Sequence, residues 1–222
     1  MKLIPRNNLL LGLNVFKQYQ QQCENFIRVN MKTDLAHDLL HVKRVVKSAT
    51  DIAFIEKADL NVVLPAAWLH DCVNYPKNHA LRAQSSLLAA NKAIEFLMRI
   101  DYPEQYLEAI HHAIAAHSVS GEITATTLEA KIVQDADRLD AVGAIGIARC
   151  IQVSTQLQRS LYAEEDPFAE DREPNDQLFT LDHFYKKLLR LAATMNTQQG
   201  QLIALQRTEF MKDYLQQLAL EI

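Results

Sequence analysis

The chain has 222 residues, of which 49% are hydrophobic and 23% charged, and its formal net charge at pH 7 is -4. A chain of this length and hydrophobic content can form a sizeable core. It has no basic tract, which argues against a protein that binds duplex nucleic acid. Polar residues interrupt the apolar patch at the N-terminus, so we expect no signal peptide, no membrane span and a cytoplasmic protein. The three cysteines, Cys23, Cys72 and Cys150, form no CxxC pair and are expected as reduced thiols in the core.

Apolar residues recur at three- and four-residue spacing between only five glycines and six prolines, which predicts an all-α protein. In chain order, the expected helices cover residues 13–29, 37–55, 60–73, 80–100, 104–117 and 128–149, followed by two segments after Leu181. Pro65 is expected in the first turn of its helix, where proline is tolerated. From Ser154 to Gln177 the pattern lapses into an acidic stretch with two prolines, which predicts a long surface loop, either a lid or disordered.

The first motif that could supply catalytic or metal-binding side chains is HDLLHVKRV. On a helix, His37, His41 and Arg44 fall along one narrow stripe at the edge of an apolar face, from which a half-buried histidine can still reach a cleft. Taken singly, each histidine is more commonly a surface or hydrogen-bonded residue, so this stripe is suggestive only.

Two His-Asp pairs occur, His37-Asp38 and His70-Asp71, where chance predicts about one, so the dipeptide alone is a weak signal. Their contexts differ. Asp71 closes the apolar run LPAAWLHD, where a carboxylate costs several kcal/mol unless a cation or a hydrogen bond compensates it. Asp38 lies in a polar helix start and can be solvated. The second pair is therefore the better candidate for a metal site.

A third segment, KIVQDADRLDAVGAIGIARC, embeds aspartates in an apolar helix, although aspartate is not favoured inside helices. Asp137 and Asp140 lie about one turn apart on one side of it. The alternative is an ordinary solvated face capped by Arg138. Two imidazoles and two carboxylates would suit Mn²⁺, Fe²⁺, Co²⁺, Ni²⁺ or Mg²⁺, whereas structural zinc normally uses thiolates. Four protein ligands would leave positions for water and substrate.

The order H…HD…D, written here as HDLLHVKRV, LHD and DADRLDAVGAIGIAR, resembles the HD-domain phosphohydrolases. The likeness covers residues 33–150 and continues through EEDPF and LDHFYKKLL, as in small bacterial members. It implies a helical bundle and a divalent metal held by His41, His70, Asp71 and Asp137. It also implies hydrolysis of phosphate esters or anhydrides, often of nucleotides. We accordingly expect one structural domain, with an N-terminal helix packed on the core (1–32), a metal-binding core (33–150) and a lid-like loop with C-terminal helices (151–222).

After the HD pair the chain reads CVNYPKNHALR and lacks the acidic residues that stringent-response hydrolases carry there. We expect Lys77 and Arg82, with His79, to meet phosphate oxygens, although a solvated turn explains them equally well. The expected mechanism is attack on phosphorus by a water that the metal activates. The expected substrate is a nucleotide or another small phosphorylated metabolite. The acidic loop, with Tyr162 and Phe168, is expected to form a lid or a wall that stacks on the base.

Four further residues are assigned to supporting roles. His112 or His117 is expected to act as a general acid or to bind phosphate, although a structural role is the commoner one for either histidine alone. Asp140 or Asp135 is expected to orient the metal ligands. Two other functions stay open: an HD-type di-iron oxygenase, which would use His112 and His117 at a second metal site, and a non-catalytic ligand sensor. The sequence does not decide whether the protein forms a homo-oligomer.

Overall fold

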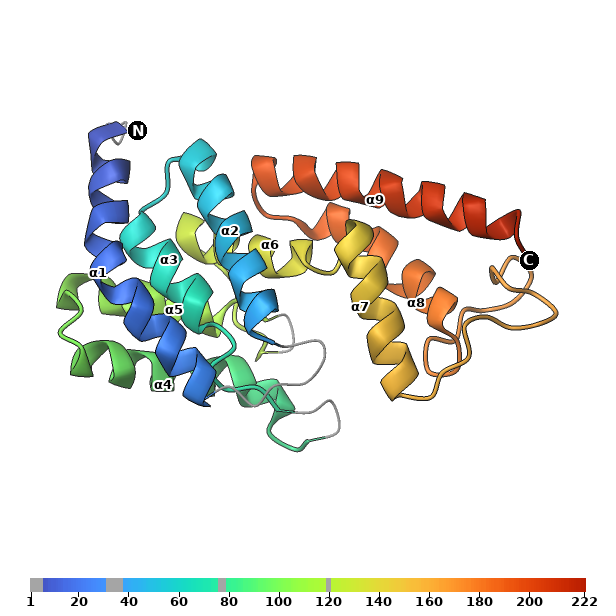
Figure 1. Cartoon of the computed structure of the whole chain (residues 1–222), viewed down its shortest axis with the longest axis horizontal. Coiled ribbons are helices and arrows are strands. Elements are labelled where there is room, and N and C mark those ends of the chain that lie inside the picture. The colour runs from blue at the N-terminus through green and yellow to red at the C-terminus, as the bar shows by residue number, and fades with distance from the viewer. Residues whose placement is uncertain (1–5, 31–37, 76–78, 119–120) are drawn as a thin grey trace. The chain divides into compact units, whose positions relative to one another are not determined.

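The computed structural model describes residues 6–30, 38–75, 79–118 and 121–222, with side chains from Phe16 onward. The regular secondary structure of the described residues consists of helices and one isolated parallel bridge between Ser160 and Phe179, which confirms the predicted all-α class. The α-helices are α1 (Arg6–Asn30), α2 (Leu39–Glu56), α3 (Leu60–Leu69), α4 (Ser85–Arg99), α5 (Leu107–Ala115), α6 (Leu128–Leu139), α7 (Gly143–Gln156), α8 (Thr180–Lys186) and α9 (Gln198–Ala219) (Figure 1). Short 3₁₀ helices are Arg82–Gln84, Glu104–Tyr106 and Leu188–Thr194.

The chain divides into two compact units, residues 1–137 and residues 138–222, called here the N-terminal and C-terminal units. This boundary lies inside α6, whereas the sequence suggested boundaries near residues 32 and 150. The prediction of a single structural domain stays a prediction.

Helix α3 is the central helix of the N-terminal unit, because it packs against α1, α2 and α5, while α4 packs along α5 (Figure 1). Its sequence LNVVLPAAWL is apolar almost all round, and only Asn61 of its ten residues is not buried. A helix without a polar face gains most by being surrounded by other helices. The residues that follow its last turn therefore enter the interior of this unit.

Pro65 lies in the middle of α3 and not in the first turn, so that expectation was wrong. A proline inside a helix leaves the carbonyl four residues earlier without its usual N–H donor. In this helix the hydroxyl of Tyr102 donates to the Asn61 carbonyl at 2.6 Å and replaces the missing bond. The helix thus keeps its path to residue 69 through a side chain that lies far away in the sequence.

The single helix expected over 128–149 is two helices, α6 and α7. The break is at Gly143, whose φ of +76° suits glycine and few other residues. Two arginines bond the backbone carbonyls at the end of α6: Arg207 donates to Leu139 O at 2.5 Å, and Arg149 donates to Asp140 O at 3.0 Å. A left-handed glycine and these side-chain donors together replace the continuous helix that the apolar periodicity predicts.

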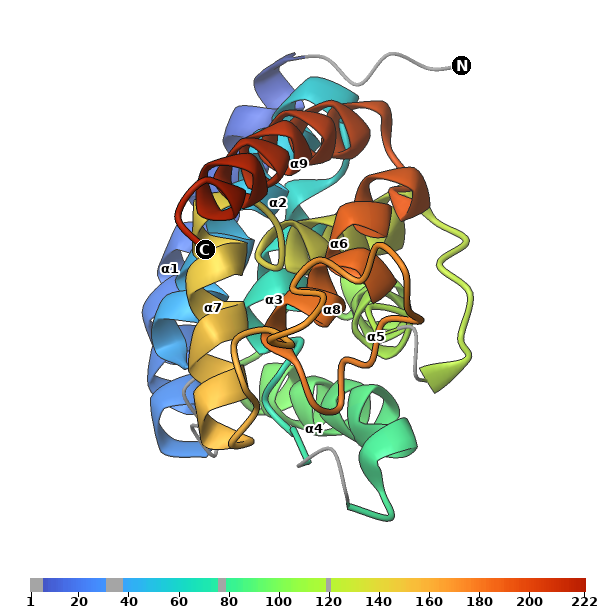
Figure 2. The ribbon, with the colours of Figure 1, turned by 90° about the vertical axis from the view of Figure 1, so that its right-hand side faces the viewer.

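In the C-terminal unit, α9 packs against α7 and against the 3₁₀ helix Leu188–Thr194, which also contacts α8. The expected acidic loop is present between α7 and α8, and Figure 2 shows it returning to its starting point. Its two ends are joined by hydrogen bonds from Ser160 N to Leu178 O and from Thr180 N to Ser160 O, at 3.1 and 2.9 Å. Its role as a lid stays a prediction.

Candidate metal centre

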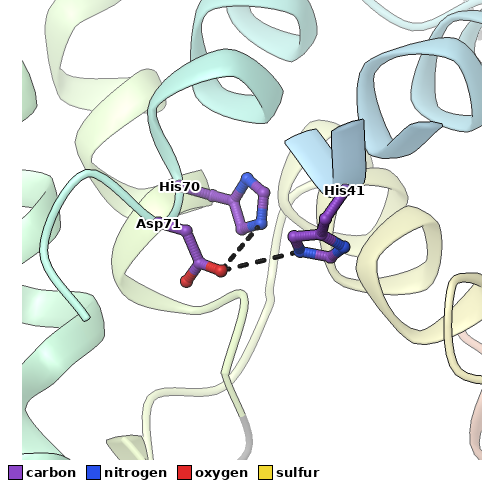
Figure 3. A group of neighbouring side chains, drawn as sticks. All are labelled: His41, His70 and Asp71. Atoms are coloured by element: carbon purple, nitrogen blue, oxygen red, sulfur yellow. Dashed lines mark ion pairs between the residues drawn. The ribbon is translucent and has the colours of Figure 1, made fainter. Parts of the chain in front are cut away.

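His70 directly follows the last residue of α3 and is fully buried. Its Nδ1 donates a hydrogen bond to the Ala67 carbonyl at 2.8 Å, which leaves the lone pair on Nε2. Nε2 is directed toward His41 and Asp71 (Figure 3). A backbone carbonyl that fixes one ring nitrogen, so that the other faces a cation, is the usual arrangement of a metal-binding histidine.

Asp71 and His41 complete a compact group with His70. Oδ2 of Asp71 lies 3.6 Å from Nε2 of His41 and 3.6 Å from Nε2 of His70 (Figure 3). One ligand atom from each of the three residues lies within 4.8 Å of the others, and all three residues are buried. His41 lies in the first turn of α2 and His70 directly follows α3, so two separate helices position the two imidazoles.

Asp137 approaches the same histidines from the last turn of α6. Its Oδ1 lies 3.4 Å from Nε2 of His41 and 3.9 Å from Nε2 of His70, and about a third of its side chain is exposed (32%). Burial raises the pKa of Asp137, but the facing imidazoles of His41, His70 and His117 lower that pKa more, so the carboxyl is ionised at neutral pH. The four residues of the predicted ligand set therefore converge in one place.

Nε2 of His70 is buried and has no hydrogen-bond partner among the described residues. Burial also lowers the pKa of His70, although Asp71 opposes that effect, so the imidazole is neutral and its nitrogen is an acceptor. A buried polar atom without a partner costs roughly 1–3 kcal/mol. A cation between this nitrogen and the two carboxylates would satisfy it, so the donor set fits a divalent metal ion.

Cys72 follows Asp71 in the sequence, but it does not offer a thiolate to the metal site. Its Sγ donates to the Ala89 carbonyl at 3.3 Å, and burial raises the pKa of the thiol to about 12. The thiol therefore stays protonated at neutral pH. The donors in this group are nitrogen and oxygen only, and none of the three cysteines of the chain forms a disulfide, as the sequence predicted.

His117, one of the two proposed acid or phosphate-binding histidines, lies beside the group. Its Nε2 is 3.7 Å from Oδ1 of Asp71, and its ring meets that of His70 edge to face with centroids 5.1 Å apart. His112 is directed elsewhere: its Nε2 accepts a hydrogen bond from the Thr126 N–H at 3.2 Å. The oxygenase hypothesis needs both histidines at a second metal, and only His117 is placed for that role.

The remaining predicted residues have other partners or are not described. Nη1 of Arg82 donates to Asn74 Oδ1 and, at 2.7 Å, to the Tyr75 carbonyl, so this arginine holds the turn after the HD pair. Asp140 forms an ion pair with Arg149 at 2.8 Å inside the C-terminal unit. Lys77 and His37 lie outside the described residues. The roles proposed for these residues stay predictions.

Known proteins resemble this chain in the region that carries the four converging residues. The HD domain family model matches residues 39–142, which include the four converging residues. The uncharacterized protein YpgQ of Bacillus subtilis is 33% identical over 190 residues, which is 84% of each chain. This chain belongs to the HD-domain family.

Solved structures extend the likeness over nearly the whole HD-domain protein. The crystal structure of Bacillus subtilis YpgQ in complex with ADP is 31% identical, covers 95% of this chain and 96% of its own, and has a TM-score of 0.69. An HD-superfamily hydrolase from Bacillus thuringiensis is 29% identical over 92% of this chain and 97% of its own, with a TM-score of 0.71. The chain therefore has the fold of the HD-superfamily hydrolases. Among the described helices, none is long and apolar enough to cross a membrane.

One residue that supports the surroundings of His117, Gln134, was not predicted from the sequence. Gln134 is buried on α6, one turn before Asp137, and its Nε2 donates to the Ala116 carbonyl at 2.7 Å. This bond joins α6 to the residue next to His117. A polar side chain among the buried residues of an amphipathic helix was the available signal, because buried amides need partners.

Proposed function

We propose that this HD-domain protein is a metal-dependent phosphohydrolase, with one divalent ion held by His41, His70, Asp71 and Asp137. When bound, such an ion lowers the pKa of a coordinated water and neutralises phosphate oxygens. Manganese, magnesium, iron, cobalt and nickel all accept this mixed nitrogen and oxygen donor set.

The observation that carries the proposal is the unsatisfied Nε2 of His70. It is fully buried, its other ring nitrogen is fixed by Ala67 O, and the carboxylate of Asp71 lies 3.6 Å away, too far for a hydrogen bond. Folding would not favour an orphan nitrogen facing a carboxylate unless a third partner were bound between them. A non-catalytic sensor would use the same donors, so turnover is the property that separates the two functions.

We propose a nucleotide as the substrate class, because the related YpgQ has been crystallised with ADP. Arg82 is half-buried and stabilises the turn immediately after Asp71 through Asn74 and Tyr75. Its other guanidinium donors make it a candidate for phosphate contacts, as the sequence suggested. Asp71 and Asp137 would hold the ion through carboxylate oxygens, and His41 and His70 through their Nε2 atoms.

The decisive experiment is a hydrolysis screen with protein stripped of metal and then reloaded. Nucleoside mono-, di- and triphosphates and sugar phosphates are each incubated with Mn²⁺, Mg²⁺, Co²⁺, Ni²⁺ or Fe²⁺. We expect turnover of at least one nucleotide, its loss with chelator, and its loss in Asp71→Asn. Asp38→Asn is the matched control, since it changes the carboxylate of the other His-Asp pair, and it should keep its activity. Failure of every metal to support any turnover, with the ion bound, would favour a sensor.

A further inference from the structure

Helices α2, α3 and α6 position the four converging residues, and each helix has its ligand at one end. His41 lies in the first turn of α2, His70 and Asp71 follow the end of α3, and Asp137 lies in the last turn of α6. The opposite ends of α2 and α3 are joined by residues 57–59. The geometry of the metal centre therefore depends on how α6 is attached to this short turn.

Glu129 makes that attachment. It lies in the first turn of α6, and its Oε1 accepts a hydrogen bond from the backbone N–H of Asp59 at 3.1 Å. Asp59 is the N-cap of α3, and the bond is partly buried. One carboxylate thus joins the start of α6 to the turn between α2 and α3, across 70 positions of sequence.

The N-terminus of α3 needs this carboxylate because its own sequence cannot supply one. Asp59 already accepts the Asn61 N–H with its side chain at 2.8 Å. In a capping box, a Glu or Gln at the third helical position accepts the remaining N–H, that of the N-cap residue. In α3 that position is Val62, which is buried because the helix has no polar face. Glu129 completes the capping box from a different helix.

A second bond holds α6 nearer to its end, where Gln134 donates to the Ala116 carbonyl at 2.7 Å. Two attachments fix the direction of a helix, whereas one leaves it free to tilt. Glu129 precedes Gln134 by five residues, and Asp137 follows it by three. At the helical rise of about 1.5 Å per residue, a shift of about 1 Å at the first turn moves Asp137 by roughly 0.6 Å. Functional side chains need to be held within about 0.5 Å.

We propose that Glu129 is a positioning residue of the metal centre, which by bonding Asp59 N–H holds α6 at the angle that brings Asp137 to His41 and His70. This inference rests on the proposed function. Glu129 touches neither the ion nor the substrate, and its effect passes through Asp137, whose Oδ1 lies 3.4 Å from Nε2 of His41. Loss of the bond therefore weakens the contribution of Asp137 to metal binding and leaves those of the other three ligands.

The test is a Mn²⁺ titration of the whole metal-free chain, in which electron paramagnetic resonance measures the free ion. Glu129→Ala should bind Mn²⁺ about 5-fold more weakly than wild type, less than the 10–100-fold typical of residues that bond a metal ligand directly. Glu129→Gln keeps an oxygen acceptor for the Asp59 N–H and should stay within about twofold of wild type.

Asp59→Ala is the matched control. It removes the side-chain cap of α3 but keeps the backbone N–H that Glu129 accepts. Asp59→Ala and Glu129→Ala should both melt below wild type in chelator, since each loses one bond at the same helix end. Only Glu129→Ala should lose affinity for Mn²⁺.

A double-mutant cycle shows whether the effect passes through Asp137. In a chain that already carries Asp137→Ala, adding Glu129→Ala should not weaken Mn²⁺ binding further, because the residue that it positions is gone. If Glu129→Ala is unfolded at the titration temperature, Glu129→Met replaces it, since methionine favours helices equally and has no oxygen acceptor.

Three results would overturn the proposal: wild-type Mn²⁺ affinity in Glu129→Ala, an equal loss of affinity in Asp59→Ala, or a full further loss in the Asp137→Ala chain. The second would show that any weakening of this helix end affects the ion, and the third that Glu129 acts independently of Asp137. A wild-type chain that binds no Mn²⁺ contradicts the proposed metal centre itself, and this inference with it.

Discussion

The carboxylate of Asp38 accepts a hydrogen bond from the backbone N–H of His41 at 2.7 Å and caps the N-terminus of α2. The two His-Asp pairs therefore have different uses. In the first pair, the carboxylate caps the start of a helix. This bond also fixes the turn that carries His41. The second turns its carboxylate toward two imidazoles. Asp38 is half-buried and bonded, where the sequence suggested a solvated residue.

This difference predicts opposite responses to chelation in two matched variants. Wild type should melt at a clearly lower temperature in the presence of chelator, because a bound ion stabilises the native state by mass action. Asp71→Asn should lose most of that metal-dependent shift. Asp38→Asn should retain it, since asparagine is about as good an N-cap as aspartate. Thermal melts of the three proteins, each with Mn²⁺ and with chelator, give the comparison.

The reverse pattern, with the shift lost in Asp38→Asn and kept in Asp71→Asn, would show that the site must be rebuilt around the first pair. Equal loss in both variants would show that the cap and the ion are coupled through His41.

Much of the fold could be predicted because helical periodicity is local. The expected starts of α3 and α6, at residues 60 and 128, agree with the structure, and the loop before α8 lies where the pattern lapses. Two errors have long-range causes. Pro65 is tolerated mid-helix because Tyr102, 37 residues away, bonds the freed Asn61 carbonyl. The end of α6 depends on Arg207, which no local pattern connects to Leu139.

The candidate site could likewise be predicted where the signal is local, and could not where it depends on residues distant in the sequence. The ligand set could be proposed from motif order, and the structure brings its four members together. Sequence could not separate His112 from His117, which lie five residues apart on one segment, because the choice depends on Thr126 reaching one of them. The buried environment of Asp71 could be anticipated from the apolar run before it. The burial of Gln134 could be anticipated in the same way, but its partner could not, since that partner is a backbone carbonyl of another segment.

Replacing Gln134 with methionine should destabilise the chain by about 1–3 kcal/mol, because the buried Ala116 carbonyl loses its amide donor while the volume is nearly kept. Urea unfolding in the presence of chelator measures this without a contribution from metal binding. Gln206→Met, on the exposed side of α9, is the control and should stay within about 0.5 kcal/mol of wild type. Equal stability of the two variants would mean that the bond to Ala116 contributes little.

Gly143→Ala should destabilise the chain by about 1 kcal/mol or more, for a backbone reason. At φ +76° an added Cβ is strained, and it would lie 3.0 Å from the side chain of Arg207. In an ordinary helix the same change is stabilising, since alanine is the better helix former. Ala148→Gly, at an exposed position within α7, calibrates that ordinary effect and should cost about 1 kcal/mol. A stabilised Gly143→Ala protein would place Gly143 inside a regular helix and remove the break between α6 and α7.

The acidic loop should carry a pH-dependent part of the stability through Asp182. Its side chain is fully buried, and Arg172 reaches it with two guanidinium nitrogens at 2.6 and 2.8 Å, while the Asn175 N–H adds a third bond. Burial raises the pKa of Asp182, but the bonds from Arg172 and Asn175 lower it more, so the folded-state pKa lies below the ordinary value of 3.8.

A depressed carboxyl pKa gives stability that is fully present above the unfolded-state pKa and is lost as the pH falls through the folded-state pKa. Asp182→Asn should therefore melt well below wild type at pH 6, and the difference between their melting temperatures should shrink once the pH is lowered below about 4. Melts from pH 6 to pH 3 with chelator present measure this difference apart from metal binding. Asp171→Asn, an exposed change in the same loop, should follow wild type at every pH. A difference between wild type and Asp182→Asn that stays constant over this range would mean that Asp182 stabilises the loop by packing and not by its charge.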